Sequence, residues 1–101
     1  MNEVAKIILQ QLGGNKFAAM TGAKNFVAGE NFLRFKLPKT KHFVKSGINY
    51  IEVILTPMDD YTIVLGIISG LDYTEVTMVS GIYFDQLQEV FTAHTGLDTK
   101  L

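Results

Sequence analysis

The sequence predicts an α+β fold: an antiparallel β-sheet meander of about five strands, flanked by an N-terminal and a C-terminal helix in the order α-β-β-β-β-β-α. Three observations predict it: apolar residues spaced four apart near both ends, alternation with a period of two in the middle, and short turns between the alternating segments. A chain of 101 residues has room for one hydrophobic core, so residues 1–101 are expected to form a single domain.

The first element is predicted to be a helix over residues 2–12. Asn2 is a suitable N-cap, and apolar residues recur at Val4, Ile8 and Leu12. Gly13-Gly14 is expected to end the helix, because glycine adopts the left-handed conformation at little cost.

Alternation starts at Lys16. Two short strands are expected at Phe17–Met20 and Asn25–Ala28, on either side of a turn at residues 21–24. A further strand is predicted at Phe32–Leu37, with Phe32, Arg34 and Lys36 on one face, and Pro38 ends it.

Residues 39–47 are expected to form a basic loop. Three strands with short turns follow, at Asn49–Thr56, Tyr61–Ile68 and Tyr73–Val79. In the last of them Val76 and Met78 are predicted to face the core, and Glu75 and Thr77 to face outward.

The last element is predicted to be a helix over Ile82–Thr95. Its apolar stripe comprises Phe84, Leu87, Val90 and Phe91. Gly96 is expected to end the helix, and Leu97 to fold back over it as a hydrophobic cap.

Charge is distributed unevenly along the chain. Residues 1–47 hold eight Lys and Arg against two Glu, a balance of +6, whereas residues 48–101 hold one Lys against eight Asp and Glu, a balance of −7. This asymmetry is typical of a protein with a nucleic-acid-binding or acidic-partner-binding face. The alternative is that basic and acidic strands lie side by side and neutralise each other.

Aromatic residues alternate with the cations of the first half, a pattern found in proteins that bind single-stranded nucleic acid. Cations neutralise phosphates and exposed rings stack on bases. The predicted phosphate contacts are Lys16, Lys24, Arg34, Lys36, Lys39, Lys41 and Lys45, and Phe32, which shares a face with two of these cations, is the predicted stacking residue. The core is the alternative place for the other phenylalanines.

Known catalytic and metal-binding patterns are missing. The glycine-lysine turns at residues 13–16 and 21–25 do not match a phosphate-binding P-loop, and the chain has no cysteine. His42 and His94 lie on different predicted elements, and Asp59-Asp60 and Asp72 occupy turns. We therefore expect no enzyme activity, no catalytic residue, no metal and no cofactor.

The segment Tyr61–Ile68 is apolar on both predicted faces, so one face needs a cover. A symmetric homodimer would supply it, and a loop such as residues 39–47 is the alternative. The N-terminus lacks the features of a secretory signal, and no apolar stretch approaches the roughly 20 residues of a membrane span. A soluble protein of the cytosol, without membrane contact, is therefore expected.

Three segments carry a resemblance to a known family: ILQQLGGNKFAAMTGAKNF at Ile8–Phe26, FLRFKLP at Phe32–Pro38, and TGLDTKL at the end. The chain resembles a family of short, uncharacterised proteins from bacteriophages and other mobile elements. The resemblance implies a small accessory role in the host cytosol. It implies no activity, cofactor or catalytic residue.

The leading functional hypothesis is a non-enzymatic phage-type accessory protein that binds DNA or RNA through its basic N-terminal half. The alternative is a protein-binding module, such as an inhibitor of a host defence or regulatory protein. This module would act through the acidic C-terminal half, with Asp59, Asp60 and Asp72 as its contacts.

Overall fold

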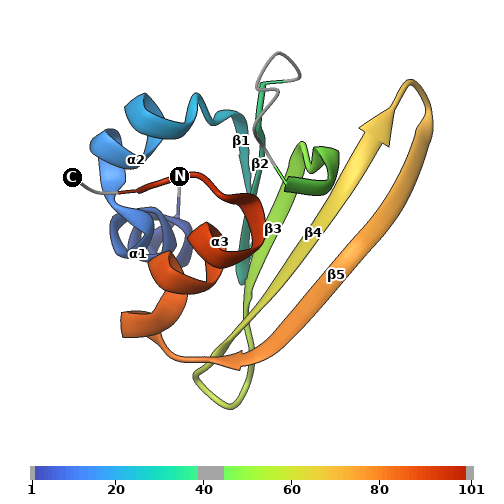
Figure 1. Cartoon of the computed structure of the whole chain (residues 1–101). Helices are drawn as coiled ribbons and strands as arrows, with labels where there is room; N and C mark the ends of the chain where they lie inside the picture. Colours follow the sequence, from blue (N-terminus) through green and yellow to red (C-terminus); the bar gives the residue numbers. More distant parts are fainter. Residues whose placement is uncertain (1, 39–44, 100–101) are drawn as a thin grey trace.

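The computed structural model describes residues 2–38 and 45–99 (Figure 1). Two of the predicted phosphate contacts, Lys39 and Lys41, lie outside the described residues, as does His42. Lys45 begins the short 3-10 helix η1 (Lys45–Gly47), but its side chain is outside the described part of the chain. The predicted basic loop is therefore described only at its end.

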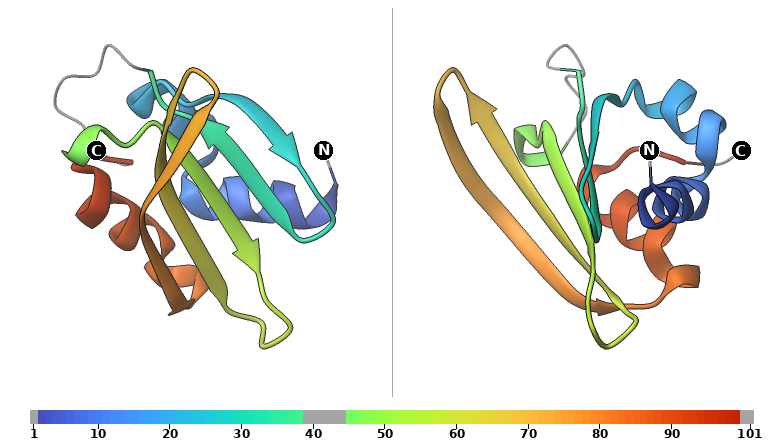
Figure 2. Two further views of the ribbon diagram at one scale, coloured as in Figure 1. Left: turned by 90° about the vertical axis from the view of Figure 1, so that its right-hand side faces the viewer. Right: turned by 180° about the vertical axis from the view of Figure 1, so that it is seen from behind.

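The chain forms a five-stranded antiparallel sheet with helices before and after it, which confirms the predicted α+β fold. The strands pair in chain order, each with the next, as expected for a meander. Their bounds are β1 (Lys24–Ala28), β2 (Phe32–Lys36), β3 (Tyr50–Leu55), β4 (Tyr61–Ser69) and β5 (Asp72–Ile82). The helices α1, α2 and α3 all cover one face of this sheet, and no helix within residues 2–38 and 45–99 lies on the other face (Figure 2). We call the second face the open face.

Two helices precede the sheet, where the sequence predicted one. Helix α1 (Glu3–Leu12) is capped as expected, because the Asn2 Oδ1 atom accepts a hydrogen bond of 2.9 Å from the Ala5 N–H group. Gly13 then adopts φ 127°, a left-handed value that favours glycine, and the chain turns directly into helix α2.

The strand predicted at Phe17–Met20 is wrong, because these residues belong to helix α2 (Gly14–Thr21). Phe17 and Thr21 are one helical turn apart and fully buried, and the Thr21 hydroxyl donates a 2.8 Å hydrogen bond to the Phe17 carbonyl oxygen. A short apolar segment fits either periodicity, and the two alanines within it favour a helix. Gly22, with φ 75°, ends α2.

The middle strands alternate between the two faces as predicted. In β2, Leu33 and Phe35 are buried under the helices, whereas Arg34 and Lys36 are exposed on the open face. The same register places Ile51 and Val53 of β3, and Ile63 and Leu65 of β4, beneath the helices.

The predicted orientation of the last strand is correct for Glu75, which lies opposite Gly66 on the open face, and wrong from Val76 onward. Val76, predicted to face the core, is 39% exposed. Thr77 lies opposite the buried Leu65, so it is on the helix side, and Met78 lies opposite Val64, on the open face, with 56% of its surface exposed. The register of β4 and β5 shifts near Val76, where β5 has an extra residue. A bulge of this kind reverses the orientation of the residues that follow it.

The C-terminal helix starts later than predicted. Ile82 is the last residue of β5, and the chain then forms a 3-10 turn, η2 (Phe84–Gln86), before helix α3 (Leu87–Thr95). Phe84, predicted to belong to the apolar stripe, is 64% exposed. The predicted cap is confirmed: Gly96 has φ 78° and Leu97 is buried.

Three phenylalanines join the helices to the sheet. The Phe17 ring of α2 lies 5.4 Å from the Phe35 ring of β2 and 5.2 Å from the Phe91 ring of α3, both in edge-to-face geometry. Edge-to-face aromatic pairs add to the stabilisation that comes from burial. The core therefore lies between the helix layer and one face of the sheet.

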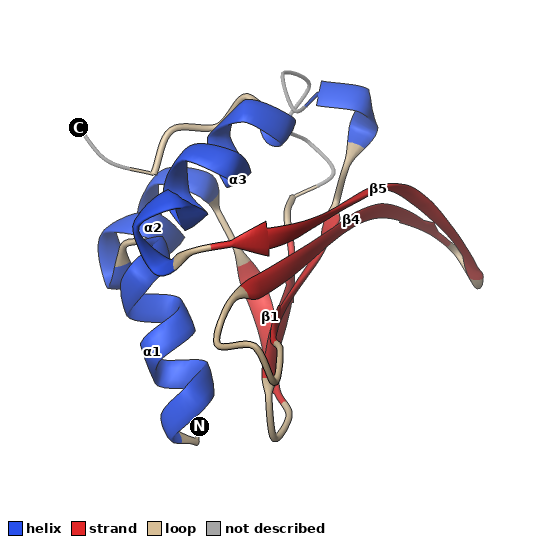
Figure 3. Cartoon of the chain, turned by 90° about the horizontal axis from the view of Figure 1, so that it is seen from below, coloured by secondary structure: helices blue, strands red, loops and turns tan. Residues whose placement is uncertain are grey.

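The β4–β5 hairpin extends beyond the helices and curves toward the open side of the sheet (Figure 3). Its tip is a two-residue turn, Gly70-Leu71, in which Leu71 is fully exposed. This curvature makes the open face concave. None of the helices in the described ranges has the length and apolar character needed to cross a membrane.

Candidate functional site

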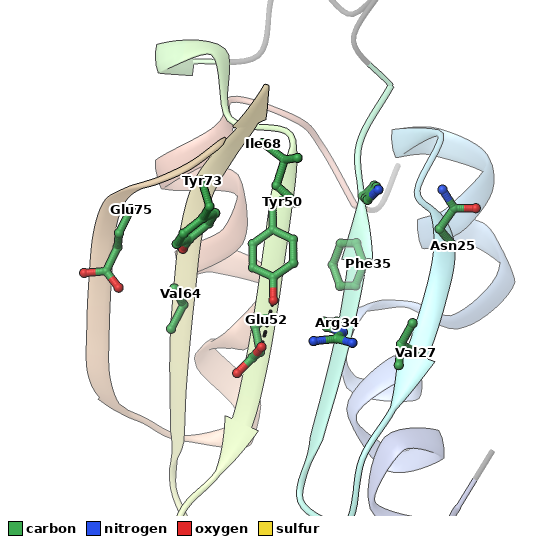
Figure 4. A pocket seen from close by; sticks show the side chains of 11 residues that line it. Asn25, Val27, Arg34, Phe35, Tyr50, Glu52, Val64, Ile68, Tyr73 and Glu75 are labelled. Carbon is green, nitrogen blue, oxygen red and sulfur yellow. Dashed lines mark hydrogen bonds between the residues drawn. The ribbon is translucent and has the colours of Figure 1, made fainter. Parts of the chain in front are cut away.

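A groove of about 740 Å³ lies on the open face, and every strand of the sheet contributes to it (Figure 4). Pockets of a few hundred to about 1,000 Å³ are typical of ligand sites. The groove is lined by Asn25, Val27, Arg34, Lys36, Tyr50, Glu52, Val64, Ile68, Tyr73 and Glu75, and it is also bordered by Phe35, whose side chain is buried on the helix side. Its lining therefore combines cations, carboxylates and aromatic rings.

Two tyrosines form an aromatic pair in the groove. The Tyr50 and Tyr73 rings are 5.3 Å apart and nearly perpendicular. The Tyr73 side chain lies against the backbone of Gly66, where an added Cβ would come within 2.5 Å of its ring. Glycine weakens a strand interior, and it often marks a place where another group approaches closely. The position of the Tyr73 ring therefore accounts for Gly66.

Tyr50 also holds a carboxylate. Its hydroxyl donates a 2.8 Å hydrogen bond to the Glu52 Oε1 atom (Figure 4). Burial first, and then the hydrogen bond and negative charge of Glu52, raise the pKa of Tyr50 from 10.0 to about 12, although nearby Arg34 acts in the opposite direction. Tyr50 is therefore a stable donor near neutral pH.

The cations of β2 have different neighbours. Arg34 lies directly opposite Glu52 in the register, and its guanidinium carbon is 5.8 Å from the centre of the Phe32 ring, a cation–π distance. Lys36 lies between Tyr50 on one side and Lys24 on the other. In the sheet register a carboxylate therefore lies opposite Arg34, as the alternative interpretation of the charge asymmetry requires, whereas the residues opposite Lys36 are Tyr50 and Lys24.

A second hollow, of about 450 Å³, continues the groove toward the end of β2. The two hollows share Asn25, Lys36 and Ile68, and the second adds Lys24 and Pro38. Asn49 shapes this end, because its side-chain amide accepts a 2.8 Å hydrogen bond from the Ile68 N–H group and donates a 3.0 Å bond to the Ile68 carbonyl oxygen. The cationic end of the groove is thus held by a local hydrogen-bond network.

The fold brings together some of the predicted nucleic-acid contacts. Lys24, Arg34 and Lys36 line the two hollows, and Phe32 lies on the same face beside Arg34. Lys16 does not join them, because it is an exposed residue of α2 in the helix layer.

The acidic residues of the alternative hypothesis are separated. Asp59 and Asp60 belong to the turn between β3 and β4, and Asp72 is the first residue of β5. The two positions lie at opposite ends of the nine-residue strand β4. They do not form one surface.

Tyr50, Tyr73, Asn25, Glu52 and Glu75 line the groove but were not predicted as site residues. One available signal was alternation within Asn49–Thr56, which puts Tyr50 and Glu52 on the same face of the strand. The glycine within β4 was a second available signal, because it indicates close approach by another group. Asn25 and Tyr73 reach the groove through the pairing of β1 and β5 with their neighbours. Alternation within a single strand does not reveal that pairing.

The part of the chain that the structure describes offers no group of three His, Cys, Asp or Glu side chains that could hold a metal ion. His94 is in the last turn of α3, on the far side of the sheet from the groove. No protein-family model, curated protein or solved structure matches this chain.

Proposed function

We propose that this protein binds single-stranded nucleic acid along the open face of its sheet. The observation that carries the proposal is the gathering of Lys24, Arg34 and Lys36 on one concave face with the Tyr50–Tyr73 pair. Single-strand binders combine cations that follow the backbone with rings on which bases stack.

The shape of the site favours a single strand over a duplex. The rings lie inside a concave groove, where only unpaired bases can reach them. Bases within a duplex are already stacked on each other, and a protein reads their edges instead. The Tyr73 side chain is 47% exposed, so it retains surface for a ligand.

The affinity should be modest. The two hollows carry the three cations Lys24, Arg34 and Lys36 and the two carboxylates Glu52 and Glu75, a net charge of +1. For single strands the logarithm of the binding constant changes by about −0.7 per neutralised phosphate for each decade of salt, so three contacts predict a slope of about −2.

The direct test is fluorescence anisotropy with labelled single- and double-stranded DNA and RNA over a range of salt concentrations. We expect micromolar or weaker binding to single strands with a slope near −2, and weaker binding to duplexes. Absence of binding at low salt, or binding with no salt slope, would contradict the proposal.

A matched pair of variants separates the groove from general charge. Arg34→Gln with Lys36→Gln removes two charges from the groove, whereas Lys6→Gln with Lys16→Gln removes two exposed charges from the helix layer. We expect the first pair to reduce the salt slope by the equivalent of about two phosphate contacts and the second to leave it unchanged. Equal effects would place binding elsewhere.

A second pair tests the aromatic contribution. Tyr73→Leu removes a ring from the groove, and Tyr83→Leu removes a more exposed ring outside it. Loss of one stacked base costs about 1–3 kcal/mol, so Tyr73→Leu should weaken binding by about five- to 150-fold. Tyr83→Leu should leave binding as it is.

Protein binding remains a second candidate, favoured by three exposed apolar residues at the other end of the sheet. Met58, Tyr83 and Phe84 are 81%, 60% and 64% exposed. The pairing of Tyr61 with Ile82 brings the turn that holds Met58 to the same end as Tyr83 and Phe84. Asp59 and Asp60 lie in that turn, so a basic partner with an apolar anchor would fit.

Pull-down from host lysate distinguishes this candidate. Loss of a captured protein on Asp59→Lys with Asp60→Lys, but not on Asp72→Lys at the hairpin tip, would favour it. Met58→Ser with Phe84→Ser should act in the same way, and Leu71→Ser serves as its control. Equal loss in the controls would exclude this end as the contact.

The phage-type accessory role in the host cytosol stays a prediction, as does the homodimer. The open face of β4 carries the half-buried Val64 and Ile68, which border the groove. A second copy that covered this face would compete with a ligand in the groove. Sedimentation measurements over a range of protein concentrations test the dimer directly.

A further inference from the structure

Phosphate binding does not explain why Glu52 and Glu75 line a groove that also holds cations. A carboxylate repels phosphates, and a stacking platform needs no carboxylate beside it. Glu52 is also held in place, because its Oε1 atom accepts the Tyr50 hydroxyl hydrogen bond. A positioned acceptor of this kind suits a ligand that offers N–H donors.

The neighbours of Glu52 define what such a ligand must present. Arg34 is directly opposite Glu52 in the sheet register, so a planar fork of donors lies beside the acceptor. The Tyr73 ring lies against Gly66 and edge-to-face with Tyr50. One place in the groove thus combines an acceptor, a donor and an aromatic surface (Figure 4).

Among the four common bases, guanine matches this combination. Its N1–H and N2–H groups are adjacent donors that a carboxylate can accept together, and its O6 atom, next to N1, is an acceptor for an arginine. Adenine and cytosine have an unprotonated ring nitrogen beside their amino group. The lone pair of that nitrogen would repel a carboxylate oxygen. Uracil and thymine offer a single N–H between two carbonyl groups.

We propose that the groove recognises a guanine base within the single strand, an inference that rests on the proposed function. Glu52 accepts from N1–H and N2–H, Arg34 donates to O6, and the base stacks on Tyr73. Tyr50 is a positioning residue that fixes the Glu52 carboxylate. A volume of about 740 Å³ is of the size found for small-molecule sites, which is enough for a nucleotide.

The test uses labelled oligothymidylates that carry one central dG, deoxyinosine, dA or dC. A good bidentate contact to a base discriminates against the wrong base, so we expect the dG oligonucleotide to bind about tenfold more tightly than the dA or dC one. Deoxyinosine lacks only the N2 amino group and should fall between them. This comparison needs no variant of the protein.

Two matched variants assign the preference to Glu52. Glu52→Gln should abolish the preference for dG while binding to plain oligothymidylate is kept or strengthened, because a negative charge is removed. Glu75→Gln removes the same charge from the same groove and should keep the preference. Tyr50→Phe should reduce the preference in part, because the carboxylate loses its positioning hydrogen bond.

The outcomes separate this inference from the function on which it rests. Equal, salt-dependent binding to all four oligonucleotides overturns guanine recognition and leaves single-strand binding intact. A preference that survives Glu52→Gln in a folded variant also overturns it. Absence of binding to every oligonucleotide overturns both.

Discussion

The helix-covered face and the open face of the sheet are built from alternate residues of the same strands, yet their chemistry differs most in β2 and β3. Leu33, Phe35, Ile51, Val53, Ile63 and Leu65 on the covered face are all at most 1% exposed. The open face of the same sheet carries the charged residues of β2 and β3, two tyrosines and an exposed methionine, together with the half-buried Val64 and Ile68 of β4. The covered face provides most of the buried apolar surface, and the open face is therefore available for binding.

Substitution on the covered face should have the greatest effect on stability. Phe35→Ala removes a ring that packs within 5.4 Å of both Phe17 and Phe26, so it should lower the free energy of unfolding by about 3–5 kcal/mol. Met78→Ala, on the open face, should change it by only about 0.5 kcal/mol. Urea denaturation measures both values. A loss of several kcal/mol for Met78→Ala would show that something, such as a second copy, covers the open face.

A smaller effect is expected where the open face is itself tightly packed. In Gly66→Ala the new Cβ would lie 2.5 Å from the Tyr73 ring and 2.8 Å from the Thr74 carbonyl oxygen, so the free energy of unfolding should fall by about 1–3 kcal/mol. In a Tyr73→Ala background the same change should cost less, but not zero, because the carbonyl oxygen remains. Equal costs in both backgrounds would show that Tyr73 does not pack on Gly66.

The smallest effect concerns pH. The folded pKa of Tyr50, about 12, is above its ordinary value of 10.0, so the folded state holds the phenol proton more strongly than the unfolded state does. The resulting stabilisation is fully present below pH 10 and is lost as the pH rises toward 12. Tyrosinate absorbance should show one phenol titrating near pH 12, absent in Tyr50→Phe and shifted lower in Glu52→Gln. An unchanged titration in both variants would contradict this assignment.

Much of the sheet could be predicted because most of its strands have one apolar face. Alternation predicted strands at Phe32–Leu37 and Asn49–Thr56, close to the observed β2 and β3, and it placed Arg34 and Lys36 on the correct face. The caps at Asn2 and Gly96 were equally clear, because each has a local chemical cause. Signals of this kind depend only on a few neighbouring residues, so they can be read without knowledge of the fold.

The errors arose where local signals were ambiguous or long-range pairing decided the structure. The segment Phe17–Met20 is too short to distinguish helix from strand by periodicity, and the extra residue near Val76 reversed the orientation of the residues after it. Phe84 had helical spacing, but the chain does not become α-helical until Leu87. In the candidate site, the cations of β2 could be predicted because they lie on one strand. The place of Tyr73 in the groove depends on how β5 pairs with β4, and no local signal in the sequence shows that pairing.

The strict alternation of β2 and β3 has a practical consequence for protein engineering. Codons for Arg34, Lys36, Tyr50 and Glu52 can be randomised together without altering any side chain under the helices. A display library built on these four positions would sample new ligand preferences on an unchanged framework. The chain is therefore a small, cysteine-free scaffold for selecting artificial binders.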